Sequence, residues 1–492
     1  MDEPWLDKQH TWQGHWWLPD EPDDAVAGVL TYELRGGLTL DLIGGFEDKI
    51  LEEVRPGAYN VRDESRTWPV VHGVAANKEV TLLDCVPTHT MSRNFGAPEE
   101  QTIRPRAALV GVHLDQPQEA AFSECHISVE DLTRWSASSV LEGTLGWEEE
   151  KLTGKGTISV KPVEEPTVVV DGTRITLAHE HTLPHFEAKR GSTVGSVRDT
   201  AFLRFQPKQP WSLCTAQEHV KALQDLLSLA MHRACGVLWL RLRMPPEERA
   251  RPETYPILDR EVDVYSQYTV TGDSTAKAVE QRAVLFTCRD LPFAEVVPRW
   301  LEVRRDCEAA SNMVLGLRYA PARYIEGQLL TAVGAAEVMH RALKLGKPPI
   351  PDEEFKALRE ALLEHVPQDR RKWFKETLGR NDPTLRERLR SLAGLPDHEA
   401  MERLVPDVEQ WAKVATQARN DLAHEGKTPR QSIDELIAVV RVTGAVVVMN
   451  LLQVLEVPGE RQREIVRDHP ELRQVARSAR EHLTAERGEA GQ

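Results

Sequence analysis

The sequence predicts an α+β protein with more than one domain: a β-rich N-terminal module, folded as a sandwich or a distorted barrel with helices, followed by an all-α helical bundle. Short runs in which apolar and polar residues alternate, separated by Gly, Pro and Asp, fill the first part of the chain. From Pro292 onward, the apolar residues recur at helical spacing instead. A chain of 492 residues is long enough for two or three domains, each with its own core.

The first strands form a predicted hairpin, in which the alternating runs 29–34 and 38–43 are joined by Arg35-Gly36-Gly37. Further strands are expected at 79–86, 107–114, 166–183, 200–206, 236–243, 262–270 and 283–288. A helical period over 215–234 interrupts them, so residues 1–291 form one module, or two subdomains with a break near 210–235. Near the start, three tryptophans either form a ligand platform or, in the interpretation we prefer, pack the rim of this module: Trp12, Trp16 and Trp17.

The second part of the chain has helical spacing throughout. Helices are expected within 322–346, 352–366 and 397–426, and residues 292–457 form the bundle, followed by a charged helical tail at 458–492. The segment 436–455 is long enough to span a membrane. However, Arg441 lies inside it, and Ser432 and Glu435 form a capping box before it. We therefore expect no membrane span, but a helix buried in a core or in an oligomer seam.

Composition narrows the classes of function. The net charge of −16 argues against a protein that coats nucleic acid without regard to sequence, although a local basic site stays compatible with RNA binding. The six cysteines contain no C-x-x-C pair, which predicts reduced, mostly buried thiols. We expect no metal site and no cofactor. The acidic start, MDEPWLDKQH, lacks the features of a signal peptide, so a cytoplasmic protein is expected.

The spacing Arg-x-x-x-x-His occurs three times in the chain. Arg174 and His179 lie in an alternating run, where residues five apart point to opposite faces of a strand. Arg477 and His482 lie near the C-terminus in a stretch that is charged nearly all round, which predicts a solvated face. We interpret neither pair as a functional site.

The third copy, Arg419-Asn420-x-x-x-His424, has different surroundings. Its helix carries an apolar stripe with which it can dock: Trp411, Ala415, Ala418 and Leu422. Asn420 and His424 are one turn apart and share a face, whereas Arg419 starts roughly 140° around the helix and reaches that face only through its long side chain. Gly426 follows closely, which places His424 in the last turn, at the negative end of the helix dipole.

These residue types suit RNA cleavage without a metal, in which the 2′-OH of the RNA attacks the neighbouring phosphorus. His can take or give a proton near neutral pH, and the planar fork of Arg can stabilise charge on the phosphorane. Asn420 could hold the imidazole or a phosphate oxygen. In the alternative, His424 caps backbone carbonyls and Arg419 pairs with Asp421 or Glu425. Spacing by itself favours this alternative, since the pattern occurs twice elsewhere by chance.

Two segments resemble a known family. The motif, on a helix followed by a capped apolar helix, resembles the signature of HEPN-domain ribonucleases. Residues 14–46, GHWWLPDEPDDAVAGVLTYELRGGLTLDLIGGF, resemble the opening of ApeA-type anti-phage proteins. The resemblance covers nearly the whole chain and implies an ApeA-like sensor or regulatory module at 1–291 and a HEPN-type domain at 292–457.

The resemblance further implies a metal-independent endoribonuclease whose active site forms across a homodimer. It implies a role in abortive-infection anti-phage defence in a prokaryotic cytoplasm, with transfer RNA as one candidate target. Arg419, Asn420 and His424 would then be the catalytic residues. An acidic residue from an earlier helix would approach them, for which Glu337 is the first candidate and Glu326 the second.

For RNA contact, we expect the basic stretch 369–390, where Trp373 and Phe374 could stack on unpaired bases. The predicted RNA-binding residues are Arg370, Arg371, Lys372, Trp373, Lys375 and Arg386. The alternative is a charged helical hairpin whose two aromatic residues belong to the core.

Three functions follow from these alternatives. The first is a nuclease that forms a dimer or a higher even oligomer and is restrained until a phage-derived trigger binds the N-terminal module. The second is a non-catalytic HEPN-type oligomerisation or adapter module, and the third is a β-domain ligand sensor with a helical signalling tail. A His424 that faces a solvent-reachable groove favours the first, whereas a His424 sealed in the core favours the second.

Overall fold

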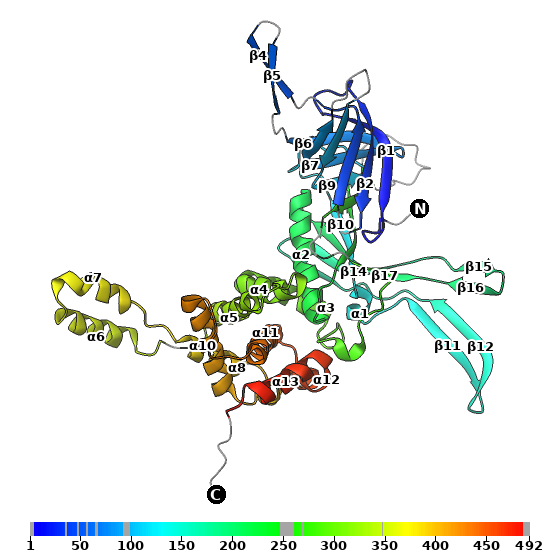
Figure 1. The fold of residues 1–492 in the computed structure, drawn as a ribbon. Helices are drawn as coiled ribbons and strands as arrows, with labels where there is room; N and C mark the ends of the chain where they lie inside the picture. Colours follow the sequence, from blue (N-terminus) through cyan, green and yellow to red (C-terminus); the bar gives the residue numbers. More distant parts are fainter. Residues whose placement is uncertain are drawn as a thin grey trace. The chain divides into compact units, whose positions relative to one another are not determined.

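The computed structural model describes residues 4–34, 37–46, 49–55, 58–63, 67–91, 99–246, 260–267, 270, 272–346 and 348–485 (Figure 1). The chain divides into two compact units. Unit 1 comprises Met1–Val279 and Thr287–Pro298, and unit 2 comprises Glu280–Phe286 and Arg299–Gln492. The expected boundary at Pro292 thus falls inside a segment that belongs to unit 1.

Unit 1 is rich in strands. In the described residues these are β1 (His10–Trp17), β2 (Val26–Glu33), β3 (Gly37–Ile43), β4 (Lys49–Arg55), β5 (Ala58–Asp63), β6 (Trp68–Ala75), β7 (Lys78–Met91), β8 (Glu100–Arg104), β9 (Ala107–Val110), β10 (Glu124–Val129), β11 (Leu141–Glu148), β12 (Lys151–Val160), β13 (Thr167–Val170), β14 (Thr173–His181), β15 (His185–Lys189), β16 (Ser192–Ser196), β17 (Asp199–Pro207), β18 (Val237–Arg243) and β19 (Glu261–Ser266). Helices α1 (Leu132–Ser136) and α2 (Leu213–Ala230) accompany them.

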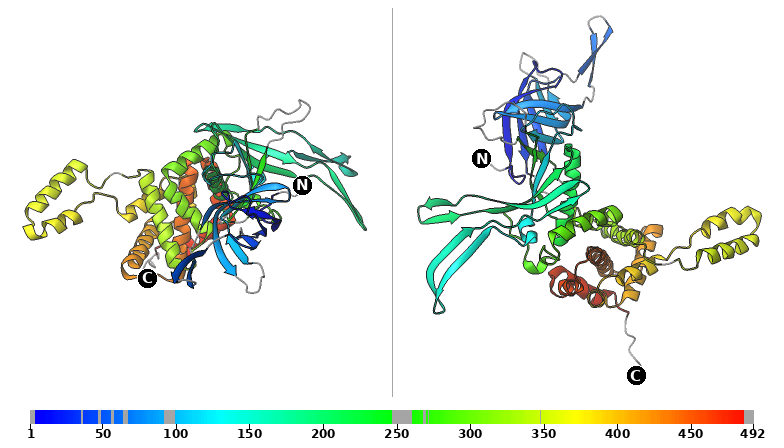
Figure 2. Two further views of the ribbon diagram at one scale, coloured as in Figure 1. Left: turned by 90° about the horizontal axis from the view of Figure 1, so that it is seen from above. Right: turned by 180° about the vertical axis from the view of Figure 1, so that it is seen from behind.

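Six of these strands close into a barrel. In the order β7-β6-β1-β2-β3-β8 each strand pairs with the next, and β8 pairs back with β7. The sheet then continues from β7 through β9, β19, β18, β10, β17, β14 and β13. Figure 2 shows the strand-rich part of the chain, coloured from blue to cyan and green, in two further views. The barrel is therefore the correct one of the two predicted β architectures, and an open sheet extends it.

The predicted first hairpin is present and belongs to the barrel. β2 pairs with β3 in an antiparallel register that places Leu30 opposite Leu40, and both side chains are fully buried. Alternation along each strand gives the barrel its apolar interior. The turn residues Arg35 and Gly36 lie outside the described residues.

The three N-terminal tryptophans pack within unit 1. Trp16 is fully buried and lies opposite Gly73 of β6, where any Cβ would collide with the indole ring. Trp12 contacts Tyr265 edge-on, with ring centroids 4.8 Å apart, and the half-buried Trp17 contacts His113 in the same way at 5.4 Å. The packing interpretation therefore describes these residues better than a ligand platform.

The strand expected at 283–288 is wrong. Leu285 and Phe286 are fully buried, which gives the segment a strand-like composition, but the chain leaves the 3-10 helix η1 (Gln281–Ala283) in an irregular conformation. The Arg461 guanidinium donates hydrogen bonds to the carbonyls of Val284 and Leu285, each at 2.9 Å. A side chain of unit 2 thus satisfies backbone groups that a neighbouring strand would otherwise bond.

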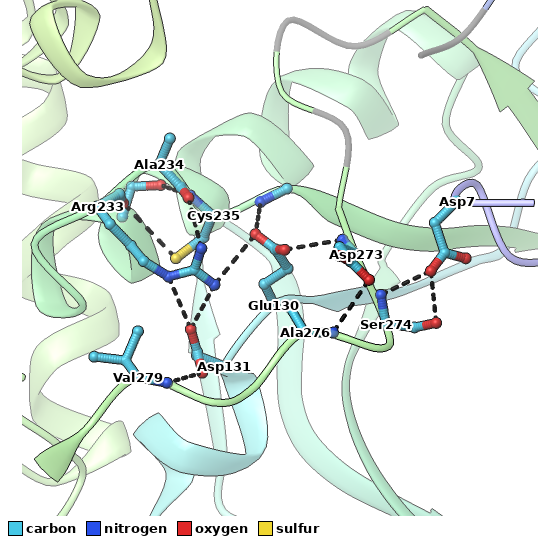
Figure 3. A network of polar contacts seen from close by, with 12 residues as sticks. Asp7, Glu130, Asp131, Arg233, Ala234, Cys235, Asp273, Ser274, Ala276 and Val279 are labelled. Carbon is cyan, nitrogen blue, oxygen red and sulfur yellow. Dashed lines mark hydrogen bonds and ion pairs between the residues drawn. The ribbon is translucent and has the colours of Figure 1, made fainter. Parts of the chain in front are cut away.

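The backbone of segment 273–279, which precedes η1, donates hydrogen bonds to carboxylates of unit 1 (Figure 3). Three backbone N–H groups donate to them: Asp273 to Glu130 (2.9 Å), Ser274 to Asp7 (2.7 Å) and Val279 to Asp131 (3.0 Å). The Arg233 guanidinium neutralises Asp131 at 2.6 Å. Side chains from distant parts of unit 1 therefore fix segment 273–279, the part of unit 1 that directly precedes η1.

His179 of β14 lies between Ser138 and Asp199. Its Nδ1 is 2.9 Å from Asp199 Oδ1, and its Nε2 is 2.9 Å from Ser138 Oγ. Only 2% of the His179 side chain and 4% of the Asp199 side chain are exposed. Ser138 Oγ also lies 3.2 Å from Ser136 Oγ, so this hydrogen-bonded chain ties the turn after α1 to β14 and β17. Arg174 is exposed, as expected for the opposite face of the strand.

Helices dominate the described residues from Phe293 onward. They are α3 (Phe293–Asp306), α4 (Glu308–Tyr319), α5 (Ile325–Ala342), α6 (Asp352–Glu364), α7 (Gln368–Thr377), α8 (Leu385–Ala393), α9 (His398–Leu404), α10 (Val408–Glu425), α11 (Ile433–Val454), α12 (Gly459–Asp468) and α13 (Pro470–His482). The predicted charged tail contains α12 and α13, which pack against α9, while α13 also packs against α11. Arg477 is exposed and His482 is half-buried, as a solvated face requires.

Helix α11 is the core of unit 2. The predicted capping box of Ser432 and Glu435 starts it, and α4, α5, α8, α10 and α13 pack around it (Figure 1). By length and composition it could cross a membrane, with a mean hydropathy of 1.9, but 72% of that apolar window is buried inside the protein. Neighbouring helices thus account for its composition, as in the core alternative of the prediction.

Candidate functional site

The Arg-Asn-x-x-x-His motif lies on α10. Asp407 caps the N-terminus through its side chain, and Gly426 ends the helix with a left-handed φ of 68°. Of the predicted apolar stripe, the first three residues are fully buried and the last is half-buried: Trp411, Ala415, Ala418 and Leu422. Trp411 Nε1 also donates to Thr443 Oγ1 of α11 at 3.1 Å. Packing on α11 therefore fixes the position of the motif.

His424 and Asn420 are exposed to solvent. His424 lies in the last turn of α10, as predicted. In the part of the chain that the structure describes, its ring makes no hydrogen bond or ion pair, so the alternative in which it caps carbonyls does not describe it. Asn420 Oδ1 accepts a hydrogen bond from Arg419 Nη1 at 3.3 Å. The imidazole is therefore accessible to a ligand.

Arg419 faces α5. Its Nη2 lies 3.8 Å from Glu337 Oε2, and 36% of the Arg419 side chain is exposed. The alternative partners do not hold it: Asp421 is buried and pairs with Arg430 at 3.0 Å, and no ion pair with Glu425 occurs among the described residues. Arg419 thus faces a carboxylate of α5, whereas His424 is exposed to solvent.

Glu337 connects three arginines. Its Oε1 accepts hydrogen bonds from Arg341 at 2.6 Å and from Arg388 at 3.3 Å, while its Oε2 faces Arg419. Only 22% of the Glu337 side chain and 11% of the Arg388 side chain are exposed, so these charges interact more strongly than on an open surface. Glu326, the second candidate, lies in the first turn of α5, roughly 16 Å away along the helix axis.

An open pocket of about 690 Å³ adjoins Glu337. His340 and Arg341 of α5 line the pocket, together with Lys344 just beyond the end of α5 and with Arg380 and Arg388. The pocket therefore lies next to the carboxylate that faces Arg419.

The predicted RNA-binding residues are divided between two elements. Five of them lie on α7, where no residue is buried, and Arg386 lies on α8, where it pairs with Glu409 at 3.1 Å. Trp373 is 62% exposed, so the alternative that places it in the core is wrong. Arg371 donates to the carbonyl of Val366 at 3.0 Å, beyond the end of α6.

Sequence reasoning missed the α5 wall of the pocket. His340 and Arg341 follow Glu337 by three and four residues, which is the spacing of one helix face, and Lys344 lies just beyond the end of α5. That signal was present within the predicted helix at 322–346. By itself this spacing does not indicate a pocket, because charged residues at this spacing usually form a solvated face.

The described residues contain no group of three or more His, Cys, Asp or Glu side chains able to hold a metal ion. The six cysteines are free, and four of them are buried. Burial raises the pKa of the Cys235 thiol to about 12, which keeps it protonated at neutral pH.

Comparison with known proteins gives two matches to family models. The family described as ApeA N-terminal domain 1 matches residues 11–300, more than half of the chain. The family described as Apea-like HEPN matches residues 330–461, which contain both Glu337 and the α10 motif. No curated protein and no solved structure matched the chain. HEPN domains are generally associated with ribonuclease activity and commonly oligomerise, and this pair of domains suggests an anti-phage defence module. The chain belongs to the ApeA family, with an ApeA N-terminal domain followed by an ApeA-like HEPN domain.

Proposed function

We propose that the protein is a metal-independent endoribonuclease of the HEPN class that acts in abortive-infection defence in the cytoplasm. The observation that carries this proposal is the accessible His424 on the same capped helix as Arg419, whose guanidinium a half-buried carboxylate orients. An adapter that kept the motif only for packing would not need an exposed, unbonded imidazole. Transfer RNA is one candidate substrate.

The proposed reaction is transesterification within the RNA. The 2′-OH attacks the adjacent phosphorus, the P–O5′ bond breaks, and the products carry a 2′,3′-cyclic phosphate and a 5′-OH. His424 transfers the proton, and Arg419 stabilises negative charge on the phosphorane oxygens. Asn420, whose amide contacts Arg419, positions a phosphate oxygen or the ring of His424.

The proposal includes a homodimer or a higher even oligomer. Within one chain, Arg419 faces Glu337, and no hydrogen bond joins it to His424 among the described residues. A second copy that places its own α10 against this one would bring both groups to one phosphate. A shared site of this kind requires an isologous interface.

The first experiment compares purified full-length protein with His424→Asn during incubation with total RNA in EDTA. We expect the unsubstituted protein to release fragments with 2′,3′-cyclic phosphate ends and the variant to release none. Trimming of these ends by a phosphatase specific for cyclic phosphates identifies the chemistry. Equal cleavage by both proteins would show that His424 is not the catalyst.

The chain provides a matched control. His482 has the same spacing from an arginine, lies in unit 2 and is 34% exposed. His482→Asn should leave cleavage unchanged, and light scattering should give all three proteins the same mass. Loss of cleavage in both variants would indicate a general effect on the fold.

A final part of the proposal is regulation. Unit 1 senses a phage-derived trigger and restrains the nuclease until the trigger binds. If purified protein does not cut RNA in EDTA, the same assay in extracts of phage-infected cells tests this part, because the trigger is then present. Absence of His424-dependent cleavage under both conditions would favour the non-catalytic adapter.

A further inference from the structure

The pocket beside Glu337 has a defined architecture. Loop residues 380–383 line the pocket together with α5, and they lead into α8, which begins with a capping box of Thr384 and Glu387. Arg388 Nε donates to the carbonyl of Pro383 at 2.9 Å. Asn381 bonds both the carbonyl and the N–H of Ile350, at 2.6 and 3.3 Å. These bonds fix the loop, so the pocket walls are formed before any ligand binds.

The charge of the pocket favours an anion. Its lining contains four cationic and three acidic side chains: Arg341, Lys344, Arg380 and Arg388, against Glu337, Asp352 and Asp382. Glu337 is already shared among three arginines. Lys344 and Arg380 are exposed and make no ion pair with any carboxylate in the described ranges. Two cations are therefore available to a ligand.

His340 supplies a second, independent observation. Only 3% of the residue is exposed, and its Nε2 is buried without a hydrogen-bond partner among the described residues. This nitrogen faces Gly346, another lining residue, where a Cβ would lie 3.4 Å from it. Burial, reinforced by Arg388 and Arg341, lowers the pKa of His340, so the ring is neutral at pH 7 and can donate one N–H.

An unsatisfied buried donor costs free energy, which a ligand oxygen at this position would recover. We propose that this pocket binds a phosphate group of the RNA strand next to the phosphate that is cleaved, with Lys344, Arg380 and the two other arginines supplying charge and His340 Nε2–H donating a hydrogen bond. This inference rests on the proposed function. Its continuity with the catalytic residues comes from Glu337, which lines the pocket and faces Arg419.

The size of the pocket fits this ligand. A volume of about 690 Å³ lies within the range of sites that enclose a molecule as large as a nucleotide. A free nucleotide has the same phosphate chemistry as an RNA strand, so the experiment must distinguish the two sources. The strand is favoured because the pocket is open and adjoins the proposed catalytic arginine through a single shared carboxylate.

The test measures binding of a fluorescent single-stranded oligoribonucleotide to the full-length His424→Asn protein over a range of salt concentrations. Adding Lys344→Gln and Arg380→Gln should weaken binding about tenfold and reduce the slope of log K against log salt by about 0.7, because the pocket contacts one phosphate and each phosphate contact to a single strand contributes about 0.7. The matched double variant is Lys372→Gln with Lys375→Gln on the exposed helix α7. It should change both quantities less. If the α7 variant weakens RNA binding more than the pocket variant does, the proposal is overturned.

His340→Leu separates a ligand contact from a structural role. It removes a hydrogen-bond donor without changing charge at pH 7, so RNA binding should weaken on the order of tenfold at an unchanged salt slope. Because the lost nitrogen has no partner, the melting temperature should not fall. A lower melting temperature with unchanged RNA affinity would make His340 a structural residue and overturn its proposed contact.

Adenosine monophosphate distinguishes the source of the phosphate. If its binding depends on Lys344 and Arg380 while RNA binding does not, the pocket takes a free nucleotide and the strand assignment is wrong. The proposed nuclease fails separately. Cleavage that depends on His424, together with unchanged RNA binding by the pocket variant, rejects only the pocket. If the pocket variant loses RNA binding and the unsubstituted protein cleaves no RNA, only the nuclease is rejected.

Discussion

Glu337 Oε2 lies 3.8 Å from Arg419 Nη2, so a carboxylate of α5 faces the guanidinium of α10. The same carboxylate accepts hydrogen bonds from Arg341 and Arg388. A single acid thus offsets the mutual repulsion of three arginines and fixes the direction of the one on the motif helix. This relationship gives the first prediction.

Glu337→Gln should impair both stability and cleavage. We expect a loss of about 1–2 kcal/mol in the free energy of unfolding, between the values for exposed and buried ion pairs, because three guanidinium groups lose their common anion. RNA cleavage should fall about tenfold as Arg419 loses its orientation. Glu326→Gln, in the first turn of the same helix, is the control and should change neither. Equal effects of the two substitutions would remove Glu337 from the site.

Two inactive subunits should together form one active site if each site uses Arg419 of one copy and His424 of the other. Co-expression of differently tagged Arg419→Ala and His424→Ala chains allows purification of the mixed dimer. One of its two sites is then intact, so we expect about half of the unsubstituted activity, by the symmetry of the dimer. Activity no higher than that of either parent would place both groups of a site on the same chain.

The hydrogen-bonded chain at His179 should matter for the stability of unit 1. His179→Ala leaves Asp199 Oδ1, in a side chain that is 4% exposed, without its ring partner, and we expect a loss of about 1–3 kcal/mol. His181→Ala is the matched control, since His181 is exposed two residues further along β14, and it should cost less than about 0.5 kcal/mol. Chemical denaturation of both variants measures the difference. Similar losses would show that the chain does not stabilise the turn.

Unit 1 should lose stability in acid through Glu124. The hydrogen bond with His126 is the main cause that lowers the Glu124 pKa from 4.5 to about 2. Burial is the main cause that lowers the pKa of His126 itself, and the hydrogen bond with Glu124 opposes this shift. A carboxyl whose folded pKa is lowered stabilises the fold above its unfolded pKa, and this stabilisation disappears as pH falls through the folded value.

The measurement compares Glu124→Gln with the unsubstituted protein by denaturation at pH 7, 4.5 and 3. The variant should be less stable at pH 7, and the difference should shrink as the pH falls from about 4.5 toward 2, because the unsubstituted protein loses the same contribution. If the difference in stability between the two proteins does not change with pH, the substitution acts through the shape of side chain 124 and not through its charge.

Unit 2 should be more stable as an isolated chain when it begins at Glu280 than when it begins at Pro292. Leu285 and Phe286 are fully buried, and the carbonyl of Leu285 accepts a hydrogen bond from Arg461. Removing this segment should cost on the order of 3–5 kcal/mol, mainly from the two buried side chains. Thermal melting of both chains tests this. Equal melting temperatures would mean that 280–286 contributes nothing to unit 2.

The chain that begins at Glu280 also tests restraint by unit 1. If unit 1 restrains the nuclease, expression of the chain from Glu280 should be more toxic than expression of the full-length protein. The toxicity should disappear with His424→Asn. A truncated chain that is no more toxic than the full-length protein, at equal abundance, would count against restraint.

The sequence by itself determined the motif helix and the place of its histidine in the last turn. The apolar stripe and the Gly426 stop of α10 act within one or two turns, so local spacing is sufficient to place His424 there, whereas its exposure was left open. Alternation likewise determined the β2–β3 hairpin, because register follows from which face is buried.

Only the tertiary structure decided which groups meet across the fold. The resemblance suggested Glu337 as the acidic residue near the motif. Its contact with Arg419, and the hydrogen bonds that it accepts from Arg341 and Arg388, depend on how α5, α8 and α10 pack. The apolar segment 283–288 does not form a strand, because the distant Arg461 donates hydrogen bonds to its backbone carbonyls. A pattern of neighbouring residues does not predict such a contact. Charged and polar contacts between distant segments depend on three-dimensional packing, whereas caps and amphipathic periods are properties of neighbouring residues.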